Sequence, residues 1–398
     1  MAEDLYRSET LLVRCIPGTD QNRWVVTFDH HSAGPGFDRP GFAEAFLKDA
    51  GVSQIAVLGA GNHWYQYRDI GVALDVVRAR IAGAAHVVTY GSSMGAYAAI
   101  RFAPRLGAHA CLAVSPQYSV DPVVVPFEWR WPDDAKTIDW LPEWNGPIER
   151  GVRTVVIADA RLDDAEHVRR IAADIPIESV SLAYIAHPAT TYLNAAGLLQ
   201  RAVIEMVEDR FDAATFRRDA HARRRQSDVY LGELARLQPA SRSRTAIRIA
   251  RRAVGVAPDS PLTHHVLGLR LGTSGQHGEA LYHHQRAVEI SERFWGYTLA
   301  YSEALAAIGR VDEAFVVAQD MVTRDPHLAP LHHWAGHLHW CQGRRPEAQY
   351  HAATACTLAP TNTFYASSLA QYHAPVRWAI ARNARWVGRR ISRWLPRA

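Results

Sequence analysis

Ser93 stands at the centre of a Gly-x-Ser-x-Gly sequence that begins at Gly91 and ends at Gly95. An apolar run at 86–89 precedes it and an alanine-rich segment at 96–102 follows it, so we place it between a strand and a helix. A sharp turn there would strain the backbone of Ser93 and hold its hydroxyl clear of the sheet, and a Cβ at either glycine would collide with a neighbouring element. Ser93 is therefore a candidate nucleophile. A small-residue turn in which this serine caps the helix is the alternative.

Short apolar strands alternate with amphipathic helices through the N-terminal half of the chain. Because neighbouring strand residues point to opposite faces, runs that are apolar throughout predict a mostly parallel sheet with helices on both faces. We expect this α/β domain to span residues 1–212, with an irregular insert at 116–150. The expected strands are 11–15, 24–28, 54–58, 86–89, 110–114, 154–158 and 180–184, and the expected helices are 40–50, 69–81, 96–102, 165–173 and 192–210.

With the serine motif in this position, residues 8–212 resemble the α/β-hydrolase family. The resemblance implies a serine hydrolase with a Ser-His-Asp triad, in which the acid and then the histidine follow the serine along the chain. His187 lies in the loop after the last expected strand, where it would take the proton of Ser93 as general base. A loop histidine bonded to the backbone is the alternative.

Two aspartates compete for the role of triad acid, which the family places after the preceding strand. Asp163 precedes a helix and has Glu166 three residues further on, which is a helix-capping pattern. Asp159 lies at the end of the strand without such a structural role, so we prefer it. Asp121, one strand earlier, is a third candidate, and the Gly-x-x-Asp sequence common in the family is absent here.

Ester hydrolysis also needs N–H donors that already point to the carbonyl oxygen on which charge builds up. The resemblance implies the amide of Met94, the residue after the nucleophile, as one donor. The second donor would come from the loop after an early strand, where the amide of His30 or His31 has the right position. The usual His-Gly pair is missing from this turn, so both histidines stay candidates.

A second loop at the carboxyl edge of the expected sheet is a candidate substrate-binding segment. Ligands of open α/β sheets bind at that edge, and aromatic and amide side chains suit a polar substrate with faces that can stack. Anchoring of the loop by buried aromatic rings is an equal alternative. The segment consists of Asn62, His63, Trp64, Tyr65 and Gln66.

The insert at 116–150 occupies the place where many hydrolases carry a lid. Its prolines rule out one long helix. Its tryptophans could bind sugar rings or an acyl chain, or they could clamp the insert onto the domain, which we favour. They are Trp129, Trp131, Trp140 and Trp144.

A helical repeat replaces the strand signals from about residue 226. The pattern Gly-x-x-x-Glu-Ala recurs with a spacing of 34 residues, at 275–280, 309–314 and 343–348. Residues 226–362 therefore resemble the tetratricopeptide repeat, whose helix-turn-helix unit has this period. We expect an all-α solenoid after a linker at 213–225, and the resemblance implies an unknown protein or peptide partner on its concave face.

Histidines recur within this repeat. His264-His265 and His332-His333 occupy the same repeat position, and His337 and His339 follow the second pair. We interpret them as a neutral polar lining of the groove rather than as a metal site, which would need convergent geometry.

The C-terminal segment, 363–398, is predicted to be a basic helix or a cap. From residue 375 it carries seven arginines and no acidic residue, with apolar residues at helical spacing. A cap on the last repeat is the interpretation we favour. The alternative is a helix that lies on an anionic membrane surface. No nucleic-acid partner is expected, because no motif for one is present.

Composition narrows the class of protein. The four cysteines are scattered without paired spacing, which suits a reducing compartment. The polar, acidic start does not resemble a signal peptide, and no apolar run reaches the length of a membrane span. With a net charge of +4 that is smaller than the charge of the C-terminal arginines, the rest of the chain is slightly acidic. We expect a cytoplasmic protein, at most peripheral at a membrane.

The combined prediction is a serine hydrolase with an ester, thioester or related acyl compound as its small-molecule substrate, and with no metal or organic cofactor. Acyl transfer to a hydroxyl other than water would use the same site. A non-catalytic interaction protein that carries a hydrolase fold is the competing class.

Overall fold

The computed structural model describes residues 2–31, 36–161, 163–360 and 362–374. The chain divides between Ser227 and Asp228 into two compact units. Across the described ranges, no helix combines the length and the apolar character that crossing a membrane requires.

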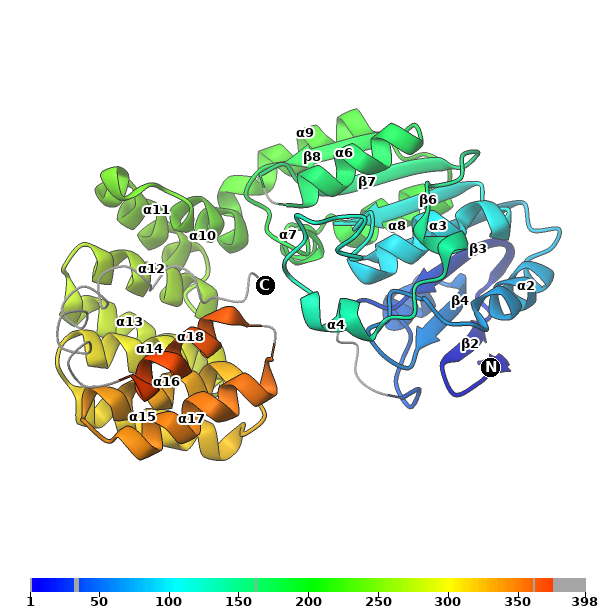
Figure 1. The fold of residues 1–398 in the computed structure, drawn as a ribbon. Helices are drawn as coiled ribbons and strands as arrows, with labels where there is room; N and C mark the ends of the chain where they lie inside the picture. Colours follow the sequence, from blue (N-terminus) through cyan, green and yellow to red (C-terminus); the bar gives the residue numbers. More distant parts are fainter. Residues whose placement is uncertain (1, 32–35, 162, 361, 375–398) are drawn as a thin grey trace. The chain divides into compact units, whose positions relative to one another are not determined.

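An eight-stranded sheet organises the first unit, with the strand order β1-β2-β4-β3-β5-β6-β7-β8 (Figure 1). Strand β2 is antiparallel to both β1 and β4, and every other neighbouring pair is parallel. The strands are β1 (Glu3–Arg7), β2 (Leu11–Ile16), β3 (Asp20–Phe28), β4 (Val52–Gly59), β5 (His86–Ser92), β6 (Ala110–Val114), β7 (Arg153–Asp159) and β8 (Glu178–Leu182).

The central strands are buried on both faces. Every residue of β6 is buried, and so is every residue of β5 after His86. Since consecutive side chains point to opposite faces, helices and loops cover both sides of the sheet, as predicted. Helices α3 and α8 both pack against β3, β5 and β6. The helices of this unit are α1 (Glu44–Asp49), α2 (Ile70–Arg80), α3 (Met94–Leu106), α4 (Pro132–Thr137), α5 (Pro142–Asn145), α6 (Asp164–Asp174), α7 (Thr190–Ala195), α8 (Leu199–Val207) and α9 (Ala213–Arg223).

Three elements differ from the sequence-based expectation. Strand β1 was not predicted, because its exposed, polar residues lack an apolar run. The single helix expected at 192–210 is two helices, α7 and α8, which are separated where Gly197 adopts a φ of 63°. The linker expected at 213–225 is wrong, since helix α9 occupies most of it and packs against β8.

The insert at 116–150 is clamped to the body of the first unit. Trp131, Trp140 and Trp144 pack against the core cluster, and the Tyr97 hydroxyl donates a hydrogen bond to the Trp144 carbonyl at 2.8 Å. The buried Arg101 side chain donates to the backbone carbonyls of Gly146 and Tyr118. These contacts favour the clamp over a mobile ligand-binding lid.

Three helical hairpins of equal length form the centre of the second unit. Their first helices begin at residues 261, 295 and 329 and their second helices at 277, 311 and 345, so each hairpin repeats the previous one after 34 residues. The pairs are α12 (Pro261–Thr273) with α13 (His277–Ile290), α14 (Trp295–Ala307) with α15 (Val311–Arg324), and α16 (Ala329–Cys341) with α17 (Arg345–Leu358). Gly275, Gly309 and Gly343 have φ values of 83°, 82° and 76°, which fits a glycine in each connecting turn.

Small residues let the two helices of each hairpin approach closely. The repeated alanines, Ala280, Ala314 and Ala348, are all buried. A Cβ at Gly268 would lie 2.8 Å from the His284 ring. At the equivalent position in the next hairpin, Ser302 Oγ donates to the Ala314 carbonyl at 2.8 Å.

Further helices flank the hairpins. α10 (Asp228–Arg236) and α11 (Ser243–Val256) precede them, and α18 (Thr363–His373) packs on α17. The Tyr372 ring of α18 stacks on Trp340 with centroids 4.8 Å apart. The predicted basic segment from residue 375 onward lies outside the described residues.

Candidate active site

Ser93 has the strained backbone that its motif predicts. Its φ of 53° and ψ of −119° are rare for a residue with a side chain. A Cβ at Gly91 would lie 2.1 Å from the Gly95 carbonyl oxygen, and one at Gly95 would lie 2.3 Å from that of Phe28. The turn from β5 into α3 therefore requires both glycines.

Three side chains form a hydrogen-bonded chain that starts at Ser93. Its Oγ lies 3.1 Å from Nε2 of His187, and Nδ1 of His187 lies 2.7 Å from Oδ2 of Asp164. All three are buried. With Nδ1 protonated and donating to the carboxylate, Nε2 is free to accept the serine proton.

The acid beside His187 is neither Asp159, which the sequence analysis preferred, nor its competitor Asp163. Asp164, the first residue of α6, occupies that place. Asp163 makes no capping hydrogen bond with its side chain, and its Oδ2 instead accepts from Trp129 Nε1 at 2.9 Å. Asp121 lies in the insert and accepts from Asn145 Nδ2 at 2.7 Å.

Asp159 holds the histidine loop rather than the imidazole. Its Oδ2 accepts hydrogen bonds from the amides of Ile185 and Ala186 at 2.6 and 3.1 Å. Ala186 has a φ of 65°, a strained value that persists only where surrounding contacts impose it. The prediction that Asp159 contacts His187 was therefore wrong. This aspartate instead positions the loop that carries the histidine.

A buried charge network from the insert supports the acid. Arg130 donates to Asp164 Oδ1 at 2.7 Å and also pairs with Glu128, whose Oε2 lies 2.8 Å from His167 Nε2. Burial alone would raise the pKa of Asp164, but the charges and hydrogen bonds of His187 and Arg130 lower it below its ordinary value. Burial also raises the pKa of Glu128. Its hydrogen bonds with His167 and Arg130 and the charge of Arg130 outweigh this effect and lower the pKa to about 2. Asp164 is thus held as a carboxylate.

The predicted oxyanion-hole donors lie near Ser93, at the turn from β5 into α3. Met94 begins α3, so its amide has no acceptor within the helix. Gly95 packs against the carbonyls of Phe28 and Asp29, which brings the end of β3 and the following His30 and His31 to the same edge. That the amide of His30 or of His31 is the second donor stays a prediction.

Gln117 is a further residue at the site that the sequence did not reveal. It follows β6, is buried, and places Oε1 3.5 Å from Ser93 Oγ while its Nε2 donates to the Ser115 carbonyl at 3.2 Å. Its position after a central strand at the carboxyl edge was the available signal.

Part of the loop that was proposed to bind substrate is buried in the core of the first unit. Tyr65 is buried and its hydroxyl donates to the Val57 carbonyl at 2.9 Å. The Gln66 side chain donates to the Tyr97 hydroxyl and accepts from the Leu141 amide. These two residues therefore anchor the loop. Asn62 and His63 are partly exposed beside them.

Trp64 belongs instead to an aromatic cluster that reaches the triad. Its ring centroid lies 5.6 Å from that of His31 and 5.4 Å from that of Trp131. The Trp131 ring in turn lies 5.7 Å from the His187 ring. An aromatic wall of this kind would shield the imidazole from water.

The repeat histidines are buried between helices, so the predicted groove lining is wrong for most of them. His264 Nδ1 lies 2.9 Å from His283 Nδ1, and the equivalent pair, His332 and His351, is 3.1 Å apart. His265, His333 and His339 are buried too. Among the described residues, no three His, Cys, Asp or Glu side chains are grouped so that they could hold a metal ion.

Comparison with known proteins found similarity in solved structures only. No protein-family model matches the chain, and no curated protein matches it. The similar structures include YrrB, described as a TPR protein with an unusual peptide-binding site, at 22% identity, with 46% of this chain and 91% of that chain covered and a TM-score of 0.32. A thermophilic TPR protein of Thermus thermophilus, TTC0263, has 22% identity, coverage of 45% and 99%, and a TM-score of 0.35.

A third similar structure is residues 41 to the end of MamA from Desulfovibrio magneticus RS-1, with 16% identity, coverage of 36% and 83%, and a TM-score of 0.30. Likeness at this level supports no statement about ligand or activity. The helix pairs of the second unit, with their spacing of 34 residues, identify it on their own as a tetratricopeptide-like helical repeat.

Proposed function

We propose that the first unit is a serine hydrolase of the α/β type that acts on an ester, thioester or related acyl group. The observation that carries this proposal is the chain of contacts from Ser93 through His187 to Asp164. The strained serine, the order of the three residues along the sequence and the mostly parallel sheet agree with it.

In the proposed reaction, Ser93 Oγ attacks the acyl carbon while His187 Nε2 takes its proton. Negative charge on the carbonyl oxygen would be stabilised by the Met94 amide and an amide of His30 or His31. The imidazolium then gives its proton to the leaving alcohol or thiol, and an acyl-serine ester remains. Water attacks this ester with His187 again as base, which releases the acid and restores Ser93. Asp164 stabilises the imidazolium in both halves.

Covalent labelling tests this assignment directly. A fluorophosphonate probe should phosphonylate Ser93 in the intact protein, and Ser93→Ala should abolish the labelling. Ser92→Ala is the matched control, because Ser92 is the adjacent buried serine and lies outside the triad. Labelling that survives Ser93→Ala would contradict the proposal.

A second candidate function is interaction with a protein through the helical repeats. The observation in its favour is a row of exposed apolar residues at equivalent positions, namely Tyr282, Val316 and Tyr350, with 58%, 68% and 65% of their surface exposed. Single exposed apolar residues are common on protein surfaces, but these three recur at the same point of successive hairpins, as expected for a shared interaction surface. This role is compatible with catalysis in the first unit. A protein that binds a partner but fails the labelling test would be a non-catalytic adaptor.

A further inference from the structure

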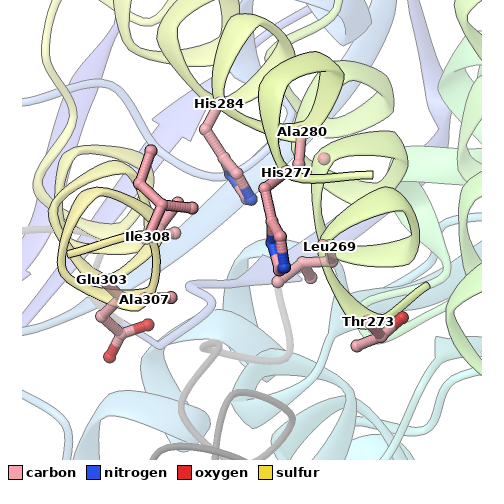
Figure 2. Close-up of a pocket in the computed structure, with 12 residues that line it drawn as sticks. Leu269, Thr273, His277, Ala280, His284, Glu303, Ala307 and Ile308 are labelled. Carbon is pink, nitrogen blue, oxygen red and sulfur yellow. The ribbon is translucent and has the colours of Figure 1, made fainter. Parts of the chain in front are cut away.

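A small pocket in the second unit lies between α12, α13 and α14, opens to solvent, and has a volume of about 50 Å³. Figure 2 shows the imidazoles of His277 and His284 pointing from α13 into the space between the other two helices, with Glu303 on the side of α14. Most of the remaining wall is apolar, with Leu269 and Ile308 as its largest aliphatic side chains.

Glu303 is the acidic residue of this pocket. Ala300, Ala304 and Ala307 lie near it on α14 in the lining of the pocket, and the Glu303 side chain is half-buried. Within the described ranges no hydrogen bond or ion pair reaches its oxygens. Desolvation consequently raises the pKa of Glu303 to about 7. The pocket thus contains an acid that an external cation would stabilise.

The neighbouring polar groups leave room for such a cation. Burial and the nearby His283 lower the pKa of His284 to about 4, so its ring is neutral at pH 7 and does not repel a positive charge. Thr273 already donates its hydroxyl proton to the Arg270 carbonyl at 3.0 Å, so its oxygen can only accept from a ligand. Acceptors and a single acid together favour a ligand with one positive charge and several N–H donors.

We propose that this pocket binds a lysine or arginine side chain of a protein partner, with the cationic group against Glu303 and the methylene stem against Leu269 and Ile308. One acid matches one cationic side chain, whereas a polyamine would leave further charges unpaired. The aliphatic wall suits the long stem of these side chains. The site rests on the proposed protein-binding role of the repeats and makes no use of Ser93.

Peptide pools test the pocket in the intact protein. Each pool contains acetylated, amidated heptapeptides with uncharged mixed flanks, a C-terminal fluorophore, and Lys, Arg, norleucine or Glu at the centre. Fluorescence anisotropy at pH 8 should show the Lys and Arg pools binding at least about tenfold tighter than the norleucine pool, which corresponds to the lower end of a paired, desolvated charge. Glu303→Gln should reduce the affinity for the Lys pool to that for the norleucine pool. Glu289→Gln, which replaces an exposed acid on α13, should leave the affinity for the Lys pool unchanged.

A pH series keeps the test decisive if Glu303→Gln folds poorly. As the pH falls from 8 to 6, protonation of Glu303 should weaken binding of the Lys pool, and this weakening should persist in His277→Gln, which removes another titratable side chain from the lining of the pocket. Binding of the norleucine pool should stay unchanged over the same range. Pools that bind without preference for a basic centre would overturn the pocket assignment and leave the protein-binding role standing. Absence of binding by every pool would overturn both. Fluorophosphonate labelling of the same samples reports the first unit independently.

Discussion

The polar side chains around Ser93 and the one acid of the pocket around Glu303 differ in whether they have partners within their own unit. Around Ser93, each charged side chain that supports the site has a partner within the unit: His187 contacts Asp164, and Asp164 also contacts Arg130. In the repeat unit, no hydrogen bond or ion pair reaches the Glu303 carboxylate in the part of the chain that the structure describes. The first arrangement fixes the orientation of the His187 ring through contacts within its own unit. The second leaves one half-buried carboxylate to which a cation from outside could bind.

The largest expected effect concerns the acid of the triad. Asp164→Asn should lower turnover of a small acyl ester by about 10⁴, because an amide cannot stabilise the imidazolium and favours the wrong tautomer. Asp163→Asn is the matched control and should stay within about threefold, since it changes the neighbouring residue without touching His187. Steady-state kinetics on the three proteins checks this. Equal losses of turnover in both variants would mean that Asp164 is not the acid that supports His187.

Removal of the Arg130 cation, which contacts Asp164, should have the next largest effect, and it should act on stability. Arg130→Gln should lower the free energy of unfolding by about 3 kcal/mol, because it leaves Asp164 and Glu128 buried with one partner fewer. Arg169→Gln, which breaks an exposed pair with Glu166, should leave the free energy of unfolding nearly unchanged. Urea denaturation followed by circular dichroism measures both. Similar values for the two variants would show that the network is not coupled to stability.

Acid should destabilise the repeat unit through its buried histidines. Burial lowers the pKa of His284 to about 4 in the folded state, so the unfolded chain takes up protons first. Stability that is present above about pH 6.5 is therefore lost as the pH falls toward 4, by roughly 2 kcal/mol at pH 5 for this residue. The difference in urea unfolding between pH 7 and pH 5 should shrink in His284→Phe. An unchanged difference in that variant would exclude this histidine as the cause.

Glu303 should give the smallest effect and the opposite sign. Its folded pKa is raised to about 7, so the folded unit binds its proton more tightly, and stability falls as the pH rises from about 4.5 to 7. Glu303→Gln should therefore raise the free energy of unfolding at pH 8 by about 1 kcal/mol, with no gain at pH 4. Thermal melts at the two pH values check this. A loss of stability at pH 8 would mean that the carboxylate has a partner in the folded protein.

Features that depend on neighbours along the chain could be predicted from the sequence. The turn around Ser93 requires Gly91 and Gly95 within five residues, so its strain is encoded locally. The hairpins follow a period of 34 residues because each unit repeats the same turn and the same small contact residues. The contact between His187 and Ser93 was predicted for the same reason, since His187 lies in the loop that follows β8, the last strand along the chain.

The tertiary structure alone decided which acid faces His187. Asp159, Asp163 and Asp164 lie within six residues of one another, and the choice depends on where β7 ends, how α6 begins, and where Arg130 arrives from the insert. Segments far apart in sequence also buried the repeat histidines and left Glu303 in an apolar pocket. Hydrogen bonds between side chains act over about 3 Å. Only the packed positions of distant segments settle which groups come within that distance.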